Sequence, residues 1–529
     1  MATEYDADVI VVGAGILGGA VANALAKKKH AVLILEAGPE VKRAEILNSF
    51  RNFGNKSDYN GPYPEQPWAS KSSTPNYIES VGPIVQKPAY LRLVGGTTWH
   101  WGGATWRNLP SDFKLQSLYG QGRDWPISYD DLEPWYQQAE EEIGVSGSDS
   151  DDQSGQGGKP FPPRSKPYPM QMQAWTYLTQ QVASKTSSVG HHFVDEPNAR
   201  AIRPYNGRPI CAGNNNCAPI CPIGAQFSGD MPVRWARENG AKLLTNAVVY
   251  KIEKGNDGKI VAIHYKTPDG KSTRLTAKYF ILAAHGVEIP KLLLISNIAN
   301  SSDQVGRNYM GHIGKSISML VKDPVWAGRG PTQQGSINTW RDGEFRKEHG
   351  SIRHFLDNTV PNELITKRLI DKGVVGPALD EAIRHDAARY LKIASYVEVL
   401  PDPINRVQLS TQVDALGIAK PKTDFRMPQY SIAALPRLFQ DYDQFRTVFA
   451  ASEVLSNPDD WVPSSHIMGT TIMGANPKDS VVNHECRTHD HANLFIASTS
   501  VHASSTVVNP TLTGYALALR IGDIISREI

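Results

Sequence analysis

The chain has 529 residues, of which 40% are hydrophobic and 20% charged, and its 55 Lys and Arg against 53 Asp and Glu leave a formal charge of +2. This length allows more than one domain, or one large interrupted domain with a sizeable core. The near-neutral balance predicts no nucleic-acid partner. No window approaches the roughly 18 apolar residues that a membrane-spanning helix needs, so we expect any membrane attachment to go through a partner. The acidic residues 1–8 do not resemble a secretory signal.

The N-terminal segment predicts a βαβ unit. An apolar strand over residues 8–12 leads through a glycine turn into a helix over 17–28 and a second strand over 31–35. This order of elements is typical of an α/β fold with a parallel sheet.

The turn of this unit has the spacing of a dinucleotide-binding loop. Gly13 permits a tight turn, Gly15 lets backbone amides approach a pyrophosphate, and Gly18 allows close packing of the helix. Glu36, eighteen residues after Gly18, can accept hydrogen bonds from ribose hydroxyls. The alternative is a glycine-rich turn in an unrelated α/β fold.

The next segments are less regular. Residues 42–87 are rich in Pro, Asn, Ser and Tyr and predict a loop wrapped over a scaffold. Residues 129–143 predict a helix capped at Ser128, which leads into a polar, low-complexity insert over 146–158 that we expect to be exposed and mobile.

The second half adds antiparallel strands and a return to the first sheet. Residues 241–253 and 259–265 alternate like antiparallel strands, with a hairpin turn at 269–270. A buried strand over 279–284 ends at Ala283 and Ala284, and a helix over 290–296 follows. A βαβ unit at the N-terminus, together with a strand so far along the chain, favours FAD over NAD as the cofactor. Residues 311–455 predict a second domain, and the tail from residue 493 predicts a strand, a turn and a final helix over 510–526.

Three of the four cysteines lie within eleven residues. Cys211, Cys217 and Cys221 stand among Asn, Pro and Gly residues whose backbone amides can turn toward sulfur, as in an iron–sulfur loop, and three thiolates suit a [3Fe-4S] cluster. A Cys₃His zinc site and a disulfide between Cys217 and Cys221 are the alternatives. Cys486 is remote and predicts a lone thiol.

These motifs resemble the glucose–methanol–choline (GMC) flavoprotein oxidoreductases, and more closely their bacterial branch of sugar dehydrogenases. The resemblance runs nearly end to end and is carried by residues 12–15, 94–101, 122–126, 214–225, 472–474 and 509–513.

The resemblance implies a Rossmann-like FAD-binding domain interleaved with an antiparallel-sheet substrate-binding domain. Gly95, Gly96, Thr97 and Thr98 match a second flavin-contacting segment, for which a plain glycine turn is the alternative. The FAD-binding domain would comprise residues 1–40, 80–115, 200–310 and 460–529, with the iron–sulfur loop at 211–225, and the substrate-binding domain 116–199 and 311–459.

Oxidation of a hydroxyl by flavin needs a base for the hydroxyl proton and a donor that holds the oxygen. His466 matches the active-site histidine of the family and Asn509 its partner, with hydride passing to N5 of FAD. The alternatives are a core histidine and a simple helix cap, because Asn509 precedes Pro510 and Thr511 at the start of the last helix. The positive end of that helix could face the flavin.

The sequence therefore predicts a sugar dehydrogenase, with glucose as the first substrate and fructose, sorbitol or a glucoside next. The resemblance implies electron transfer through the cluster to a membrane-anchored multihaem cytochrome c subunit, and export with a small signal-bearing subunit to the periplasmic face of the inner membrane. The alternatives are a GMC oxidase or choline-type dehydrogenase that works alone, and a non-catalytic flavin scaffold with structural zinc. Gly102, Gly103 and Ser465 depart from the glucose and fructose enzymes and should border the substrate.

Overall fold

A parallel sheet carries the predicted dinucleotide unit in the computed structural model, which describes residues 5–54 and 58–529. All neighbouring strands of this sheet run parallel, and their side chains are mostly buried, as expected for strands covered on both faces. In spatial order the strands are β20 (Leu494–Ile496), β11 (Ala277–Leu282), β1 (Ala7–Val12), β2 (Val32–Leu35) and β7 (Lys242–Leu244).

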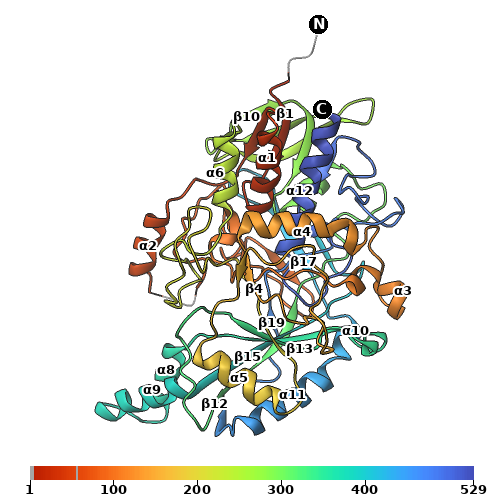
Figure 1. Cartoon of the computed structure of the whole chain (residues 1–529). Helices are drawn as coiled ribbons and strands as arrows, with labels where there is room; N and C mark the ends of the chain where they lie inside the picture. The colour runs from red at the N-terminus through yellow and green to blue at the C-terminus, as the bar shows by residue number, and fades with distance from the viewer. Residues whose placement is uncertain (1–4, 55–57) are drawn as a thin grey trace.

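Three helices pack together beside this sheet. Helix α1 (Ile16–Lys27) follows the glycine turn and contacts both α6 (Asp230–Glu238) and the C-terminal α12 (Thr511–Glu528), so that the two ends of the chain share one core (Figure 1). Helix α4 (Tyr129–Ile143) lies against α12 and begins at Ser128, whose hydroxyl accepts the N–H of Asp131.

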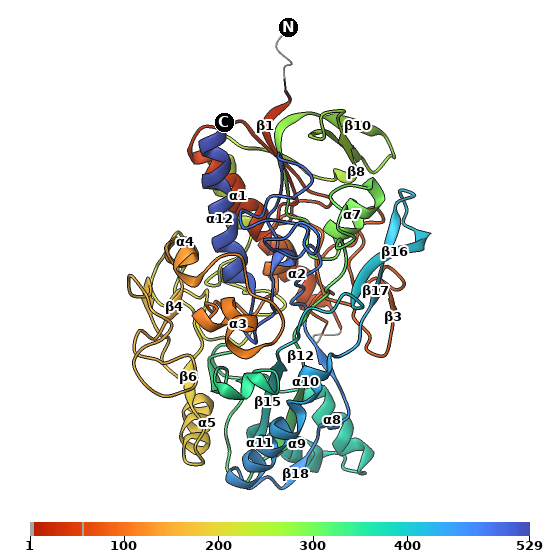
Figure 2. The same cartoon turned by 90° about the vertical axis from the view of Figure 1, so that its right-hand side faces the viewer.

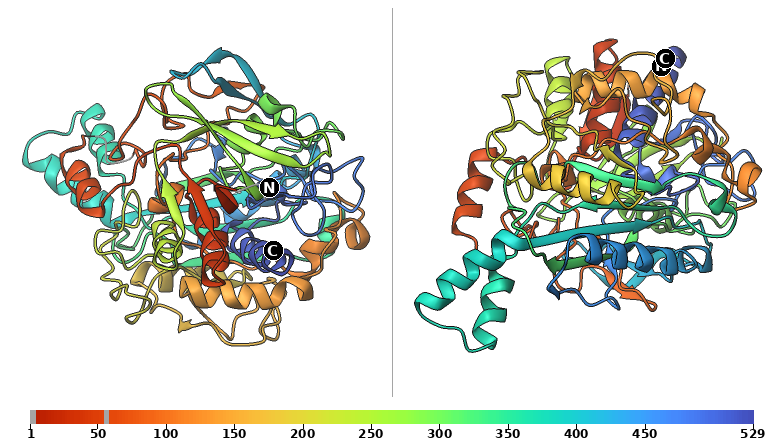
Figure 3. Two further views of the ribbon diagram at one scale, coloured as in Figure 1. Left: turned by 90° about the horizontal axis from the view of Figure 1, so that it is seen from above. Right: turned by 60° about the horizontal axis from the view of Figure 1, so that its bottom comes forward.

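An antiparallel sheet forms the opposite end of the molecule (Figure 2). Helices α5 (Tyr177–Ser187) and α11 (Leu435–Val448) bury apolar side chains against it, and α8 (Asn362–Asp371) and α9 (Pro377–Arg389) form a hairpin that projects from the body (Figure 3). The strands are, in order, β18 (Glu453–Val454), β12 (Ile313–Leu320), β15 (Tyr390–Val397), β14 (Ile352–Leu356), β13 (Gly335–Trp340) and β6 (Phe193–Asp195), with β19 (Val462–Pro463) also paired to β12.

Two three-stranded sheets and several short elements accompany the two large sheets. The three-stranded groups are β10 (Ser272–Leu275), β9 (Ile260–Lys266) and β8 (Val248–Lys254), and β16 (Arg406–Val413), β17 (Ala419–Asp424) and β3 (Glu79–Val81). The pair β4 (Ser146–Gly147) and β5 (Met170–Gln171) and the helices α2 (Arg43–Asn52), α3 (Leu115–Tyr119), α7 (Glu288–Ser296) and α10 (Gln429–Ile432) complete the regular structure.

The two sheets confirm the predicted fold class, an α/β nucleotide-binding layout joined to an antiparallel sheet. The chain passes between the two sheets several times, as an interleaved arrangement requires, while the exact domain boundaries stay a prediction. Within the described part of the chain, no helix is long and apolar enough to span a membrane. The prediction that residues 1–8 are not a secretory signal falls partly on residues 1–4, which lie outside the described residues.

Two predictions of local secondary structure are wrong. The segment 42–87 is not all loop, because α2 and β3 lie within it. Helix α2 buries only Ile46, so the sequence of this segment has little hydrophobic periodicity. The expected single strand over 241–253 is two strands in different sheets, separated at Asn246, which adopts a left-handed conformation with φ of 54°.

The insert over 146–158 is not wholly exposed. Ser146, Gln153 and Ser154 are buried. The backbone of Ser146 exchanges two 2.8 Å hydrogen bonds with Asn198, and Asn338 donates to the carbonyl of Gln153. Partners far away in sequence therefore fix this polar segment, which its composition alone could not show.

Candidate active site

The glycine turn between β1 and α1 is sterically restricted to glycine at two places. Gly13 has φ of +108°, and a Cβ there would stand 2.5 Å from the carbonyl oxygen of Ala283. A Cβ on Gly18 would collide with the carbonyl oxygen of Gly13, so Gly18 lets α1 pack against the turn as predicted. Gly15 lines the cavity beside the turn, where its backbone can approach a ligand.

Glu36 closes the turn from the end of β2. Its carboxylate accepts the N–H of Ala14 at 2.8 Å and that of Gly38 at 3.1 Å. Burial raises the pKa of Glu36, against the lowering effect of these two N–H donors. The carboxylate thus ties both arms of the turn together and still lines the cavity, where it can accept further hydrogen bonds from a ribose.

The second glycine segment lies directly on the first. The N–H of Gly95 donates to the carbonyl of Ala14 at 2.8 Å, and Gly95 pairs with Gly15 in a parallel bridge. The hydroxyl of Thr98 donates to the carbonyl of Gly95 at 2.9 Å and accepts the N–H of Gly229 at 2.7 Å. These bonds hold the start of α6 and both glycine segments around one cavity.

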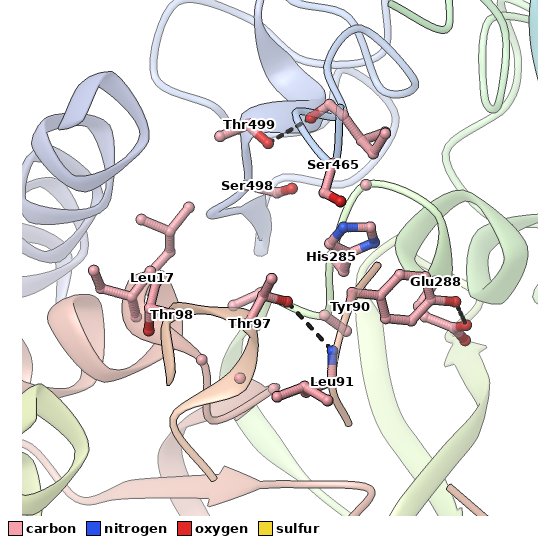
Figure 4. A pocket seen from close by; sticks show the side chains of 18 of the residues that line it. Leu17, Tyr90, Leu91, Thr97, Thr98, His285, Glu288, Ser465, Ser498 and Thr499 are labelled. Carbon is pink, nitrogen blue, oxygen red and sulfur yellow. Dashed lines mark hydrogen bonds between the residues drawn. The ribbon is translucent and has the colours of Figure 1, made fainter. Parts of the chain in front are cut away.

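This cavity has a volume of about 400 Å³ and extends from the glycine turn to the antiparallel sheet. Figure 4 shows Thr97 and Thr98 on one side of it and His285, stacked on Tyr90, on another. Of the predicted site residues, Gly18 and Gly95 act through backbone packing and do not line it. The predicted residues that line it are Gly13, Gly15, Glu36, Gly96, Thr97, Thr98, Ala283, Ala284, His466, Asn509, Pro510 and Thr511.

The lining includes polar atoms that fit a bound dinucleotide. His100 is buried, and its Nε2 has no hydrogen-bond partner among the residues that the structure describes. Burial lowers the pKa of His100 to about 4, so the ring is neutral. An unsatisfied buried nitrogen of this kind normally has a ligand or water as its partner. Together with the backbone of Gly15 and the carboxylate of Glu36 in the lining, it makes the cavity suitable for FAD.

A charged cluster that the sequence did not reveal borders the same cavity. Glu288 accepts the hydroxyls of Tyr77 at 2.7 Å and of Tyr90 at 2.5 Å, and pairs with Lys291 at 2.5 Å. Burial raises the pKa of Glu288, but Lys291 and Arg92 outweigh it and hold that pKa well below its usual range. Glu288 is therefore a fixed negative charge in the wall.

The two predicted catalytic residues meet at the far end of the cavity. Nδ2 of Asn509 lies 3.0 Å from Nε2 of His466, and both residues line the cavity. Asn509 does not cap α12: the helix has Pro510 at its N-cap position, and the Asn509 amide oxygen accepts a 2.9 Å hydrogen bond from Arg353 instead. The prediction of a cap is thus wrong, while the predicted pairing with His466 is present.

His466 is enclosed by groups from the antiparallel sheet. Its Nδ1 lies 2.9 Å from Nδ1 of His312, and the ring of Tyr396 stands edge-on at 5.4 Å. Burial, followed by the influence of His312 and of the Arg353 guanidinium, lowers the pKa of His466 well below its ordinary value. His466 is consequently neutral near pH 7 and able to accept a proton.

His312, Arg353 and Tyr396 were not singled out from the sequence. They lie in or beside β12, β14 and β15, in a stretch without motifs, and only the pairing of these strands brings them to His466. Gly102, Gly103 and Ser465, which were predicted to border the substrate, line the cavity beside this group. The hydroxyl of Ser465 accepts the N–H of Ala89 at 2.9 Å.

The three clustered cysteines are free thiols in the structure, with Cys217 and Cys221 buried and Cys211 partly exposed. Across residues 5–54 and 58–529, no three His, Cys, Asp or Glu side chains are grouped closely enough to hold a metal ion. Burial alone would raise the pKa of Cys217, but Arg200 and Thr332 outweigh it and lower that pKa.

The lone thiol of Cys486 differs from the cysteine loop. It is fully buried, and burial raises its pKa to about 12, so it is an unreactive core residue.

A cavity that runs from a glycine turn of a parallel sheet to an antiparallel sheet, with a histidine–asparagine pair at its far end, is typical of a flavoprotein oxidoreductase. Comparison with known proteins agrees: models of the family described as GMC oxidoreductase match residues 206–314 and 402–518. The chain belongs to the GMC oxidoreductase family, which implies FAD as cofactor and a CH–OH group as hydride donor.

Individual relatives match over nearly the whole length. The fructose dehydrogenase large subunit of Gluconobacter japonicus is 43% identical over 99% of this chain and 98% of the relative. The 2-methyl-1,2-propanediol dehydrogenase of Mycolicibacterium austroafricanum is 28% identical over 100% of this chain and 97% of the relative. A variant of formate oxidase from Aspergillus oryzae RIB40 has the same fold, with a TM-score of 0.67 and 16% identity over 99% of this chain and 98% of that structure.

Proposed function

We propose that the chain is the flavoprotein subunit of a dehydrogenase that oxidises a hydroxyl group of a sugar, with D-fructose as the leading substrate. The neutral His466–Asn509 pair at the end of the dinucleotide cavity carries this proposal. The 43% identity to a fructose dehydrogenase large subunit supports fructose ahead of glucose, sorbitol or a glucoside.

Two residues would act on the substrate hydroxyl. On binding, the substrate hydroxyl would replace the Asn509 N–H at Nε2 of His466, and Nε2 would then accept the hydroxyl proton, because burial, His312 and Arg353 keep the imidazole neutral. The amide of Asn509 has a second N–H, beyond the one directed at His466, that can donate to the substrate oxygen. Bound FAD would supply the acceptor for the hydride that leaves the same carbon.

The segments that would hold FAD follow from the cavity lining. Gly13, Gly15 and the start of α1 would face the pyrophosphate, and Glu36 the ribose. Thr97 and Thr98 would border the flavin ring, and Thr511 would place the start of α12 near it. The positive end of that helix would favour negative charge near its start.

We also propose an iron–sulfur cluster on Cys211, Cys217 and Cys221, with a cytochrome c subunit as electron acceptor. The support is the spacing of the cysteines, the positive Arg200 beside Cys217, and the similarity to a protein described as a large subunit. Export with a small signal-bearing subunit to the periplasmic face of the inner membrane belongs to the same proposal. Iron and acid-labile sulfide analysis of the purified chain tests it; zinc without iron would contradict it.

Turnover with a panel of substrates tests the reaction itself. The purified chain would be assayed with D-fructose, D-glucose, D-sorbitol, a glucoside and choline, using an artificial one-electron acceptor under nitrogen and then in air. We expect fructose to give the highest kcat/KM and little oxygen consumption. Oxygen-dependent turnover, or turnover of choline alone, would contradict the proposal.

A further inference from the structure

The hydrogen bonds around His312 determine which of its ring nitrogens carries the proton. Nε2 of His312 lies 3.2 Å from the carbonyl oxygens of both Ser505 and Thr506, which can only accept. Nε2 of His312 therefore carries the hydrogen. Burial, with Arg353 nearby, lowers the pKa of His312 to about 3, so the ring is neutral and its Nδ1 has no hydrogen.

This assignment also determines which nitrogen of the neighbouring His466 ring carries the hydrogen. Nδ1 of His312 is an acceptor, and the 2.9 Å contact to Nδ1 of His466 then requires His466 to donate. A neutral His466 has only one N–H, so its Nε2 is unprotonated and accepts an N–H of Asn509. This Nε2 atom faces Asn509 and the cavity.

The hydrogen bonds on the Asn509 side of His466 agree with this assignment of donors and acceptors. Arg353, which can only donate, contacts the Asn509 side-chain oxygen at 2.9 Å and turns the amide nitrogen toward His466. Glu196 holds the guanidinium in turn, with a 3.3 Å contact, and both members of this pair are 1% exposed at the side chain. Each bond thus has one donor and one acceptor, with no conflict at any step.

We propose that His312 and Arg353 are positioning residues that hold His466 as the Nδ1–H tautomer, with an unprotonated Nε2 that accepts one N–H of Asn509 at the wall of the cavity. This inference rests on the proposed function, because it assigns His466 the role of base. In the other tautomer an N–H would face the substrate hydroxyl, and His466 could not take the proton.

The surroundings leave few other groups that could set the tautomer. The titratable and charged groups that face His466 are His312 beside β12, Arg353 on β14 and Tyr396 on β15, with Glu196 behind Arg353. His312 also stacks on Tyr396 at 5.2 Å, which fixes the plane of its ring. Both positioning side chains are almost completely buried, so water does not substitute for them.

Nitrogen NMR of the flavin-loaded wild-type protein tests the tautomer directly. The wild-type chain would be labelled with ring-¹⁵N histidine, and the signals of His466 identified by their loss in His466→Asn. We expect a protonated Nδ1 and an unprotonated Nε2 for His466 between pH 6 and 8. A protonated Nε2 on His466 in the wild type would overturn the inference.

Two substitutions of His312 test the consequence for the reaction. His312→Phe keeps a ring against Tyr396 but removes the acceptor, whereas His312→Asn restores a side-chain oxygen near the position of Nδ1. We expect His312→Phe to slow flavin reduction by sugar about 100-fold with KM nearly unchanged, and His312→Asn to recover to within about fivefold of wild type. The exposed His484→Asn serves as the matched control.

The outcomes separate this inference from the proposed function. Wild-type flavin that no sugar reduces would contradict the proposed function itself. If fructose reduces the wild-type flavin but His312→Phe, with normal flavin content, reduces it at the wild-type rate, the positioning role alone is overturned. Equal loss in the Phe and Asn variants would also overturn it, because it would indicate packing around His312 and not its acceptor nitrogen.

Discussion

The amide nitrogen of Asn509 lies 3.0 Å from Nε2 of His466, although 43 residues separate the two along the chain. His466 follows β19, which pairs with β12 of the antiparallel sheet, and Asn509 lies two residues before α12, which packs beside the parallel sheet. The pair therefore joins the antiparallel-sheet side of the molecule to the parallel-sheet side, at the point where the proposed hydride transfer would occur.

Replacing the base should separate flavin binding from flavin reduction. We predict that His466→Asn retains FAD but slows reduction by sugar about 10²- to 10⁴-fold, the range expected for loss of a general base. Flavin absorbance after purification and stopped-flow reduction measure the two properties. A reduction rate within threefold of the wild type would remove His466 from the reaction.

Asn509→Asp should change the pH dependence of the reaction. A carboxylate beside Nε2 of His466 favours the protonated imidazole and so raises its pKa from its lowered value. Because only neutral His466 can accept the proton, flavin reduction in the variant should increase with pH through the raised pKa, whereas the wild type should be flat there. Rates from pH 5 to 9 measure this, and a flat profile in the variant would contradict it.

The residues of the site differ in how well the sequence alone predicts them. Gly13, Gly18 and Glu36 are predictable because a local backbone turn fixes their spacing, and the structure places all three in or against the turn. His466 and Asn509 came from resemblance to a family, since their separation in sequence gives no local signal. Their hydrogen-bond partners follow only from the pairing of β12, β14 and β15, which no short sequence pattern encodes.

Glu36→Ala should weaken FAD binding through the backbone of the turn. The change leaves the N–H groups of Ala14 and Gly38 without their acceptor, at a cost of about 1–3 kcal/mol for each group that stays buried. We predict a clearly smaller flavin-to-protein ratio after dialysis, while Glu36→Gln keeps an acceptor and loses less. Glu40→Ala, which removes only an exposed ion pair with Arg237, is the control; equal flavin loss there would refute the role given to Glu36.

Cys217→Ser should affect the electron acceptor step and not the sugar step. If the three-cysteine cluster is present, the variant should lose iron and transfer electrons slowly to a cytochrome c, with flavin reduction by sugar unchanged within about twofold. Iron analysis and cytochrome reduction measure these effects, and Cys486→Ala, a buried cysteine outside the loop, is the control. Unchanged iron and cytochrome reduction in Cys217→Ser would rule the cluster proposal out.

His502 should contribute to acid instability. The ring of His502 is buried against Trp125, and its Nε2 has no hydrogen-bond partner among the described residues. Burial lowers the pKa of His502 to about 3. The unfolded chain, with an ordinary pKa near 6.5, then binds more protons between pH 6.5 and 3, so this residue lowers stability as the pH falls through that range.

His502→Phe removes this titration and keeps a ring beside Trp125. We predict that the free energy of unfolding falls less steeply with decreasing pH in the variant, by up to about 1.4 kcal/mol per pH unit. Urea unfolding at several pH values between 4 and 7 measures the slope. Identical slopes in the variant and the wild type would show that His502 is not held neutral.

Anaerobic reduction of the bound flavin is the most direct test of the central claim, that the His466–Asn509 end of the cavity oxidises a sugar hydroxyl. The wild-type chain would be mixed with D-fructose, D-glucose, D-sorbitol, a glucoside or choline in the stopped-flow, and the flavin absorbance followed. The account predicts rapid bleaching by a sugar, fructose first, and a large loss of that rate in His466→Asn. Bleaching by choline alone, or by none of these compounds, would contradict it.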